Sequence, residues 1–437
     1  MIRQRPVELL APARNVECAM AAVDHGADAV YIGASRFGAR ASAGNSVEDI
    51  ARLVEYAHTF RVKVYVTVNT ILKDEELPET ERLVWALYRV GVDALIVQDM
   101  ALLELDLPPI PLHASTQMDN RTPEKVKFLH GLGFSQVVLA RELSLAEIQA
   151  VHEACDVPLE VFVHGALCVS YSGQCYVSQH CFGRSANRGE CAQFCRLKFD
   201  MIDSDGRMIE QGRHLLSLKD MNRGADLERL LDAGVTSLKI EGRLKDVAYV
   251  KNVTAWYRSR LDEIFKRRPE YRRASSGQVS LAFTPCLEKS FNRGFTRYFL
   301  DGRTPDIFSF HTPKSLGEEV GTVKEVRGKC IVVSGVKPFA DKLAKMEKNE
   351  AQAQRNSQIS VVAKKYGIPE FMLKDRNIPE NTDLDTYFKD MKQDMSNNGF
   401  QFSKAPETAE QKQEKEASEF AKMIEADTKS IVEQQNK

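Results

Sequence analysis

Short apolar runs alternate with amphipathic segments from Glu8 to about Phe265, and this alternation is the main structural signal along the chain. Eight runs have the length and the β-branched content of buried strands. They are Leu9–Ala11, Ala29–Gly33, Val62–Asn69, Ala94–Asp99, Leu112–Thr116, Gln136–Leu143, Leu159–His164 and Ser237–Arg243. Strands that alternate with helices predict consecutive βα units around a parallel sheet.

The segments between these runs are predicted to be surface helices. Residues 46–60, 80–91, 122–133 and 144–154 carry apolar side chains at i, i+3 and i+4, and several begin at Ser or Thr. A doubly wound nucleotide-binding fold needs a G-x-G-x-x-G turn after an early strand, and no turn here has that sequence. The fold class is therefore predicted to be α/β, a TIM-like (β/α)8 barrel over residues 1–273.

The pattern changes twice after the predicted barrel. Residues 274–340 contain short β-like stretches punctuated by glycine and predict a small partial β domain. From residue 341 to 437 the composition shifts to Lys, Glu, Gln, Asn and Asp, which predicts a charged tail, either helical or disordered.

Charge and cysteine content restrict the class of protein. The 60 Lys and Arg nearly equal the 61 Asp and Glu, so any RNA contact must be confined to local patches. The N-terminal stretch has no sustained apolar core, which predicts a cytoplasmic protein without a membrane partner. Thiols stay reduced in the cytoplasm, so the five cysteines within Cys168–Cys195 favour a metal site or catalysis over disulfides. The sequence leaves the oligomeric state unknown.

The cysteine-rich segment has the spacing C-x6-C, C-x5-C, C-x9-C and C-x3-C. We expect it to form an inserted metal loop over residues 164–198. Structural zinc usually takes tight C-x2–4-C pairs, whereas iron–sulfur clusters accept wider loops. Spacing alone therefore predicts a metal site and leaves the metal open.

This segment also carries the motif E-x-F-x-x-G-[SA]-[LIVM]-C-x4-G-x-C-x-[LIVM]-S from Glu160 to Ser178, by which the sequence resembles peptidase family U32, the collagenase-like proteins. Further matches are ELLAPA, GADAVYIG, PLHASTQ, GRSANRGECAQ and LKIEGR. The resemblance runs from about Glu8 to Val336, and the tail after about Asp341 departs from it.

The resemblance implies an RNA-modifying enzyme. The members that this sequence looks most like hydroxylate a cytidine in 23S ribosomal RNA, with prephenate as co-substrate and an iron–sulfur cluster, expected to be 4Fe–4S. Carried over by the motif, the cluster ligands are Cys168, Cys175, Cys191 and Cys195. Cys181 matches no ligand position and stays a spare thiol or a rival ligand. Other members hydroxylate a tRNA wobble uridine, which is an alternative for this chain.

Polar residues at the ends of the predicted strands are candidates for catalysis, because active sites of (β/α)8 enzymes lie there. Lys239, Glu241 and Arg243 alternate along one strand and project to the same side, either as catalytic groups or as an ion network that holds the barrel closed. His164 is either a proton-transfer group or a core histidine. The other candidates are Asn69, Gln98, Asp99, His113, Ser115, Gln117, Arg141 and Glu142.

Arginine residues are candidates for substrate binding. Arg243 and Arg141 are the candidates to hold a dicarboxylate such as prephenate, because arginine binds carboxylates bidentately. Arg184 and Arg188 in the metal loop, together with a basic helix end from Lys251 to Arg273, are candidates for contacts with ribosomal RNA phosphates.

Two other functions compete with RNA hydroxylation. A U32-type peptidase would need an activated thiol or a zincin motif, and the sequence contains neither H-E-x-x-H nor G-x-S-x-G, although Cys168 near His164 is a conceivable dyad. A non-catalytic ribosome-assembly factor would use the basic patches alone. It leaves the metal loop unexplained.

Overall fold

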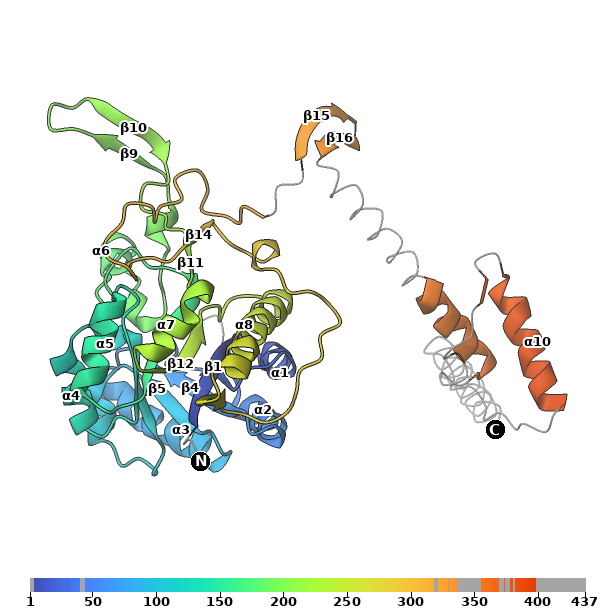
Figure 1. The fold of residues 1–437 in the computed structure, drawn as a ribbon, viewed down its shortest axis with the longest axis horizontal. Helices are drawn as coiled ribbons and strands as arrows, with labels where there is room; N and C mark the ends of the chain where they lie inside the picture. Colours follow the sequence, from blue (N-terminus) through green and yellow to red (C-terminus); the bar gives the residue numbers. More distant parts are fainter. Residues whose placement is uncertain are drawn as a thin grey trace, which may run out of the picture. The chain divides into compact units, whose positions relative to one another are not determined.

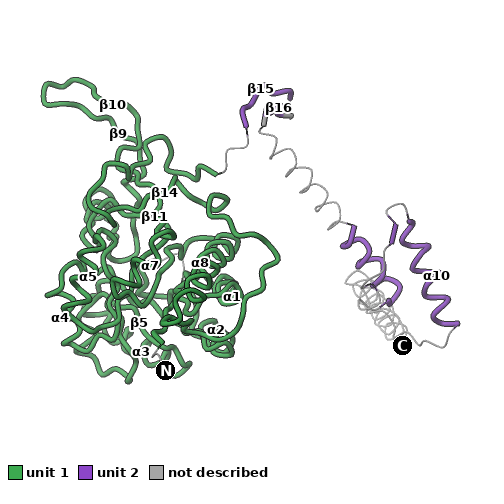
Figure 2. Tube along the Cα trace, in the orientation of Figure 1, with its two compact units in different colours: residues 1–319 green, residues 320–437 purple. Residues whose placement is uncertain are grey.

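The computed structural model describes residues 4–39, 44–317, 321–328, 330–335, 355–368, 373, 378–379 and 382–397. The chain forms two compact units, residues 1–319 and residues 320–437 (Figure 2). Residues 341–354 and 398–437, which together make up more than half of the predicted charged tail, lie outside the described residues.

Eight parallel strands close into a barrel in the first unit (Figure 1). The last strand pairs with both the first strand and the seventh, and this double pairing closes the ring. Every predicted run overlaps one of these strands, so the predicted (β/α)8 fold is confirmed. In barrel order the strands are β1 (Arg5–Ala13), β2 (Ala29–Ala34), β4 (Lys63–Val68), β5 (Ala94–Val97), β6 (Leu112–Ala114), β7 (Gln136–Val138), β8 (Leu159–Ala166) and β12 (Val235–Ile240).

Helices surround the barrel and bury their apolar faces against it. Ser46, Thr122 and Ser144 each accept a hydrogen bond from the amide three residues on, which fixes three of the helix starts where the sequence predicts them. No helix of the described ranges is long and apolar enough to cross a membrane. The helices are α1 (Val16–Asp24), α2 (Val47–Thr59), α3 (Leu77–Arg89), α4 (Pro123–Gly131), α5 (Leu145–Ala154), α7 (Leu227–Asp232) and α8 (Val247–Arg267).

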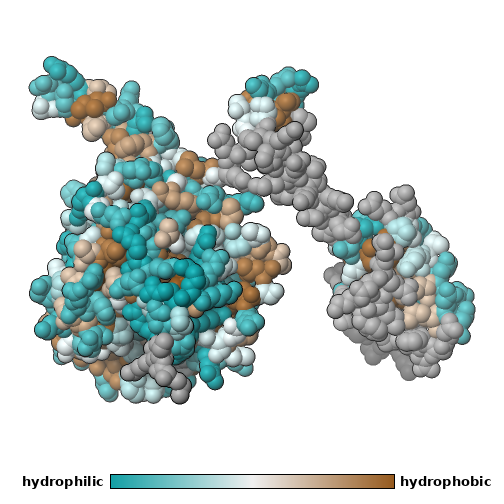
Figure 3. Space-filling view, in the orientation of Figure 1, coloured by the Kyte–Doolittle hydropathy of each residue, from teal (hydrophilic) through white to brown (hydrophobic). Residues whose placement is uncertain are grey.

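A long insertion separates β8 from α7. It begins with the cysteine loop, which contains the short helix α6 (Val177–Phe182). It continues as a hairpin of β9 (Phe199–Ile202) and β10 (Met208–Arg213), which projects from this unit (Figure 1) and carries exposed hydrophobic side chains (Figure 3). Strand β11 (Asp220–Asn222) then returns antiparallel to β8.

The segment that follows α8 stays with the barrel. Strand β13 (Tyr271–Arg273) pairs with β1, and β14 (Phe295–Thr296) pairs with β11. Residues 274–317 therefore belong to the same unit as the barrel. The two units meet at residues 319/320, whereas the sequence predicts domain boundaries at 273/274 and 340/341. Whether the predicted domains fold independently stays a prediction.

The second unit contains a hairpin and two described helical segments. The hairpin pairs β15 (Gly321–Arg327) with β16 (Cys330–Gly335). One helical segment covers residues 355–366, and the other is α10 (Leu384–Asn397). They share a small core of Ala363, Ile368, Leu384 and Phe388, so the described part of the predicted tail is helical.

Candidate functional site

A cavity of about 770 Å³ opens at the C-terminal ends of the barrel strands, where (β/α)8 enzymes have their active sites. Its volume lies in the range of small-molecule sites. The inserted cysteine loop forms one wall of the cavity and the strand ends form another. The predicted strand-end residues that line it are Asn69, Ser115, Gln117, Arg141, Lys239, Glu241 and Arg243.

Two features of the signature motif hold the loop in place. The Glu142 carboxylate accepts hydrogen bonds from the Ser172 amide at 2.9 Å and from its hydroxyl at 3.0 Å. Gly173 has φ +77°, and a Cβ there would lie 2.1 Å from the Gln117 carbonyl oxygen. Only glycine permits this close approach of the loop to the strand end. Glu142 is therefore a loop anchor rather than a cavity residue.

The four predicted ligand cysteines, Cys168, Cys175, Cys191 and Cys195, all line this cavity. The Cys168 thiol donates a hydrogen bond to the Cys175 sulfur, which lowers the pKa of Cys175 to about 6. The same contact and burial raise the pKa of Cys168 well above its usual value. Burial also raises the pKa of Cys195, with smaller contributions from the nearby Cys168 and Cys191.

Backbone amides point at three of these sulfurs in one repeated pattern. In each case the backbone two residues on makes the hydrogen bond, from Ser170 to Cys168 and from Val177 to Cys175. The Gln193 amide donates to the Cys191 sulfur at 3.4 Å. Such bonds stabilise thiolates, and hydrogen bonds to sulfur are one of the factors that tune iron–sulfur centres. The three amides therefore favour the thiolate form of Cys168, Cys175 and Cys191.

The four thiols that line the cavity match the number of ligands that a 4Fe–4S cluster takes. Among the described residues, no three His, Cys, Asp or Glu side chains converge on one point as single-ion ligands. A 4Fe–4S cluster binds each thiolate to a different iron, so its ligands stay apart around a larger body. Cys181 is exposed and does not line the cavity, and Cys18 and Cys155 are buried elsewhere.

The cavity wall is strongly cationic. It contains seven basic residues and two acidic ones. Arg141 lies over the Phe162 ring, with its guanidinium carbon 3.7 Å from the ring centroid, and it is ion-paired with Glu241 at 2.8 Å. The excess of positive charge favours an anionic ligand.

Lys239 belongs to a buried network inside the barrel as well as to the cavity floor. Its ammonium lies 2.6 Å from a Glu160 carboxylate oxygen, and the Gln136 amide donates to the other oxygen at 2.6 Å. Both charged side chains are buried. Of the two predicted roles for this strand, Lys239 therefore has the geometry of the ion network. Arg243 is also buried and donates to Thr67.

His164 lies outside the cavity. Its imidazole contacts the rings of Tyr249, Tyr257 and Phe295, and its Nδ1 lies 3.4 Å from the Tyr257 hydroxyl. Burial lowers the pKa of His164 to about 3. The structure therefore places His164 as a neutral core histidine between β8 and α8, away from the thiols.

We expect this buried histidine to make stability depend on pH. The folded pKa of about 3 lies below the ordinary value of 6.5, so the unfolded chain takes up a proton first as the pH falls. The stability difference is absent above pH 6.5 and grows below it, to about 2 kcal/mol at pH 5. Urea unfolding of wild type and His164→Gln at pH 7 and pH 5 measures it. The wild type is expected to lose more stability between the two pH values than the variant.

The matched control is His130→Gln, which replaces an exposed histidine on α4. Its stability should follow the wild type at both pH values. Equal pH dependence of His164→Gln and wild type would contradict a neutral buried imidazole.

The two loop arginines have different surroundings. Arg184 lines the cavity and donates weakly to the Glu190 carbonyl at 3.4 Å. Arg188 does not line it, because its guanidinium forms a bidentate pair with Glu76 at 2.7 and 2.9 Å. That pair lowers the pKa of Glu76 to about 2. Arg188 therefore ties the loop to the segment before α3.

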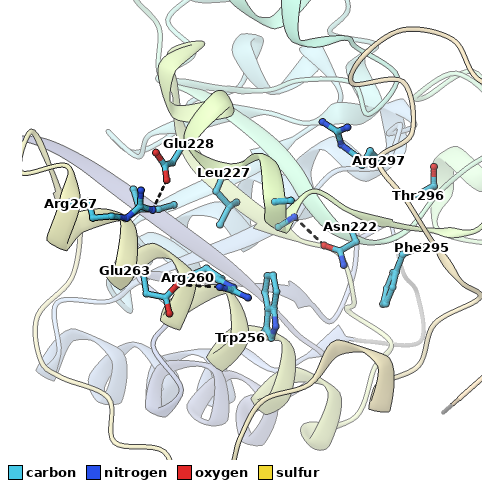
Figure 4. A pocket seen from close by; sticks show the side chains of 13 residues that line it. Asn222, Leu227, Glu228, Trp256, Arg260, Glu263, Arg267, Phe295, Thr296 and Arg297 are labelled. Atoms are coloured by element: carbon cyan, nitrogen blue, oxygen red, sulfur yellow. Dashed lines mark hydrogen bonds and ion pairs between the residues drawn. The ribbon is translucent and has the colours of Figure 1, made fainter. Parts of the chain in front are cut away.

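The basic helix end predicted as an RNA contact is largely neutralised. Arg258 is buried and paired with Asp28 at 3.1 Å. A groove of about 520 Å³ lies between α7 and α8 beside Trp256 (Figure 4). Each of its arginines has an acidic partner, and the dashed lines mark Arg260 with Glu263 and Arg267 with Glu228. The charge excess lies in the barrel mouth instead.

Sequence reasoning missed two basic residues of the cavity, Lys245 and Arg293. Lys245 follows the last barrel strand by five residues, so its place at the strand end was a readable signal. Arg293 comes from the segment after the barrel, and only the folding of residues 274–317 onto the barrel brings it to the mouth. No local pattern marks such a residue.

Comparison with known proteins gives a consistent result. The model of peptidase family U32 matches residues 14–308. The chain is 55% identical over 335 residues to a 23S rRNA 5-hydroxycytidine synthase of Escherichia coli, covering 77% of this chain and 51% of that protein. It is 36% identical over 337 residues to a tRNA hydroxylation protein of Bacillus subtilis, covering 74% and 78%. It is 32% identical over 312 residues to a collagenase of Porphyromonas gingivalis, covering 68% and 74%. The chain thus spans about half the length of the Escherichia coli relative.

Proposed function

Because the chain belongs to peptidase family U32, we propose that it is an RNA-modifying enzyme that hydroxylates a cytidine in 23S ribosomal RNA, with prephenate as co-substrate and a 4Fe–4S cluster. The observation that carries the proposal is the meeting of four thiols and a cationic pocket in one cavity at the barrel mouth. The 55% identity to a 23S rRNA 5-hydroxycytidine synthase supports the choice of RNA. The proposal places the protein with ribosomal RNA in the cytoplasm.

Cys168, Cys175, Cys191 and Cys195 would hold the cluster. All four line the cavity, and Cys168, Cys175 and Cys191 each accept a backbone hydrogen bond that favours the thiolate. A bound cluster supplies one-electron transfer or Lewis-acid chemistry at the cavity wall.

The cationic wall is suited to a dicarboxylate such as prephenate. Arginine binds carboxylates bidentately, and the low-polarity surface of Phe162 beneath Arg141 strengthens such a contact. Glu241 orients Arg141 and balances part of its charge.

The rim of the cavity is suited to an unpaired base. Tyr171 lies on the cysteine loop, lines the cavity and is 47% exposed. The Arg121 guanidinium carbon lies 4.3 Å from the centroid of its ring. An exposed aromatic ring beside an arginine can stack an extruded base, and chemistry on a base needs such extrusion.

The geometry does not favour a cysteine peptidase. Among the described residues no histidine lines the cavity, and His164 faces an aromatic layer. Cys168 donates to another thiol instead of to an imidazole. The predicted dyad of Cys168 and His164 is therefore not formed in this structure.

Mass spectrometry of ribosomal RNA tests the proposed function. In cells that lack this gene, we expect a cytidine of 23S RNA to lose a mass increment of one oxygen. Expression of this chain in those cells should restore the mass increment, whereas expression of the Cys175→Ala variant should not. Unchanged ribosomal RNA together with a lost oxygen on a tRNA uridine would point to the tRNA alternative. Unchanged RNA of both kinds would refute RNA hydroxylation and leave the peptidase and the non-catalytic assembly role.

A further inference from the structure

Lys245 is a cation without an acidic partner inside the cavity. Among the described residues, no carboxylate forms an ion pair with its ammonium, which lies 3.1 Å from the centroid of the Phe291 ring and 5.5 Å from that of Tyr249. The side chain lines the cavity and is only partly exposed. A desolvated ammonium held over an aromatic ring binds an anion more strongly than a fully hydrated one does.

The acids near Lys245 are already engaged by other groups. The Asp220 carboxylate accepts a hydrogen bond from the Arg293 amide at 3.0 Å and is ion-paired with its guanidinium. Glu241 is paired with Arg141 at 2.8 Å, and Asp246 accepts from the Tyr249 amide at 2.8 Å as the cap of α8. The positive charge of Lys245 is therefore available to a ligand in the cavity.

Two more cations surround the same corner. Arg293 has a side chain that is 6% exposed, and its Nε is buried with no hydrogen-bond partner in the described structure. Arg196 lines the same cavity, and its guanidinium donates to the Leu167 and Leu218 carbonyls. Asp220 is ion-paired with Arg293. Among the described residues, no ion pair is formed by Lys245 or Arg196. Burial and Arg293 act in the same direction on Lys245, whose pKa falls to about 8.

We infer that Lys245 and Arg293 form an anion subsite that binds a carboxylate of the small acidic co-substrate. The subsite is recessed, because Arg293 is nearly inaccessible, and this suits a small organic acid better than a phosphate within folded RNA. The Phe291 ring supplies an apolar surface beside the charge. The inference rests on the proposed function for the identity of the acid, but not for the existence of the subsite.

Calorimetric titration of the full chain with two probes, prephenate and malonate, tests the subsite. The informative variant is Lys245→Met. Loss of the ammonium leaves no buried carboxylate without its ion-pair partner, so the variant should fold. We expect it to weaken binding of both probes by roughly 10-fold or more. Lys245→Arg should bind both probes more tightly than Lys245→Met does, because it preserves the charge although not the shape of the cation. The control Lys251→Met, on α8 outside the cavity, should bind as wild type does.

The outcomes separate the two proposals. Malonate binding that depends on Lys245, without binding of prephenate, supports the subsite and refutes prephenate as co-substrate. Equal affinity of Lys245→Met and wild type for both probes, or no carboxylate binding by wild type, overturns the subsite. A Lys245→Met variant that binds carboxylates normally but a single-stranded RNA oligonucleotide more weakly also overturns it, because the subsite would then serve an RNA phosphate.

Discussion

A Cys175→Ala variant purified without oxygen is expected to be colourless and to contain almost no iron, whereas the wild type should be brown with about four irons per chain. Cys175 is at the centre of the thiol group, since it accepts the hydrogen bond from Cys168 and its pKa is lowered to about 6. Removing it would delete one of the four proposed ligands and the hydrogen-bond partner of another, Cys168. Metal analysis of both proteins, with their visible spectra, gives the measurement.

The matched control is Cys181→Ala. Cys181 belongs to the same loop but is exposed and does not line the cavity, so this variant should keep the iron and the colour. Loss of iron from Cys181→Ala would make Cys181 a ligand and contradict the assignment. If the anaerobically purified wild type contained zinc instead of iron, the four thiols would form a structural zinc site and not a cluster site.

A Lys239→Met variant is expected to lose roughly 3–5 kcal/mol of unfolding free energy, because it leaves a buried carboxylate without its partner. Glu160 is fully buried, and its remaining contact would be the Gln136 amide. Urea unfolding followed by circular dichroism measures the change. Lys127→Met on the exposed face of α4 is the control and should alter stability by less than about 0.5 kcal/mol.

The double variant Glu160→Gln and Lys239→Met separates pairing from packing. If the pair is structural, the double variant should lose less stability than the two single variants together, because neither partner is left charged and alone. A Lys239→Met protein as stable as the wild type would show that the barrel does not depend on this pair, and would return Lys239 to the catalytic candidates.

The barrel could be predicted from the sequence because the signals for its strands and helices are local. A buried parallel strand must be apolar over its whole length, and a covering helix must be apolar on one face, so eight strands and four helices are readable from short windows. The end of Gln136–Leu143 was harder to predict. Its strand stops at Val138, and the next residues leave the sheet to bring Arg141 to the cavity and Glu142 to Ser172 of the cysteine loop.

The four cysteines were also predictable, although from the family motif and not from spacing. The motif places two glycines and two cysteines in one short segment, and the structure gives a steric reason for Gly173 in its approach to Gln117. The assignment of the metal itself stays a prediction. Cys191 and Cys195 lie beyond this motif, with fifteen residues between Cys175 and Cys191, and their assignment rests on the wider family resemblance.

The sequence by itself determined that this chain is a (β/α)8 barrel with a thiol-rich loop, since hydrophobic period and motif spacing are properties of adjacent residues. Only the tertiary structure decided the direction of each polar side chain. His164 and Lys239 both lie on barrel strands, yet His164 faces an aromatic layer and Lys239 a buried carboxylate. Arg293 reaches the mouth from far along the chain. The burial of a side chain and the charges around it depend on contacts between segments far apart in the sequence. A local sequence pattern does not predict those contacts.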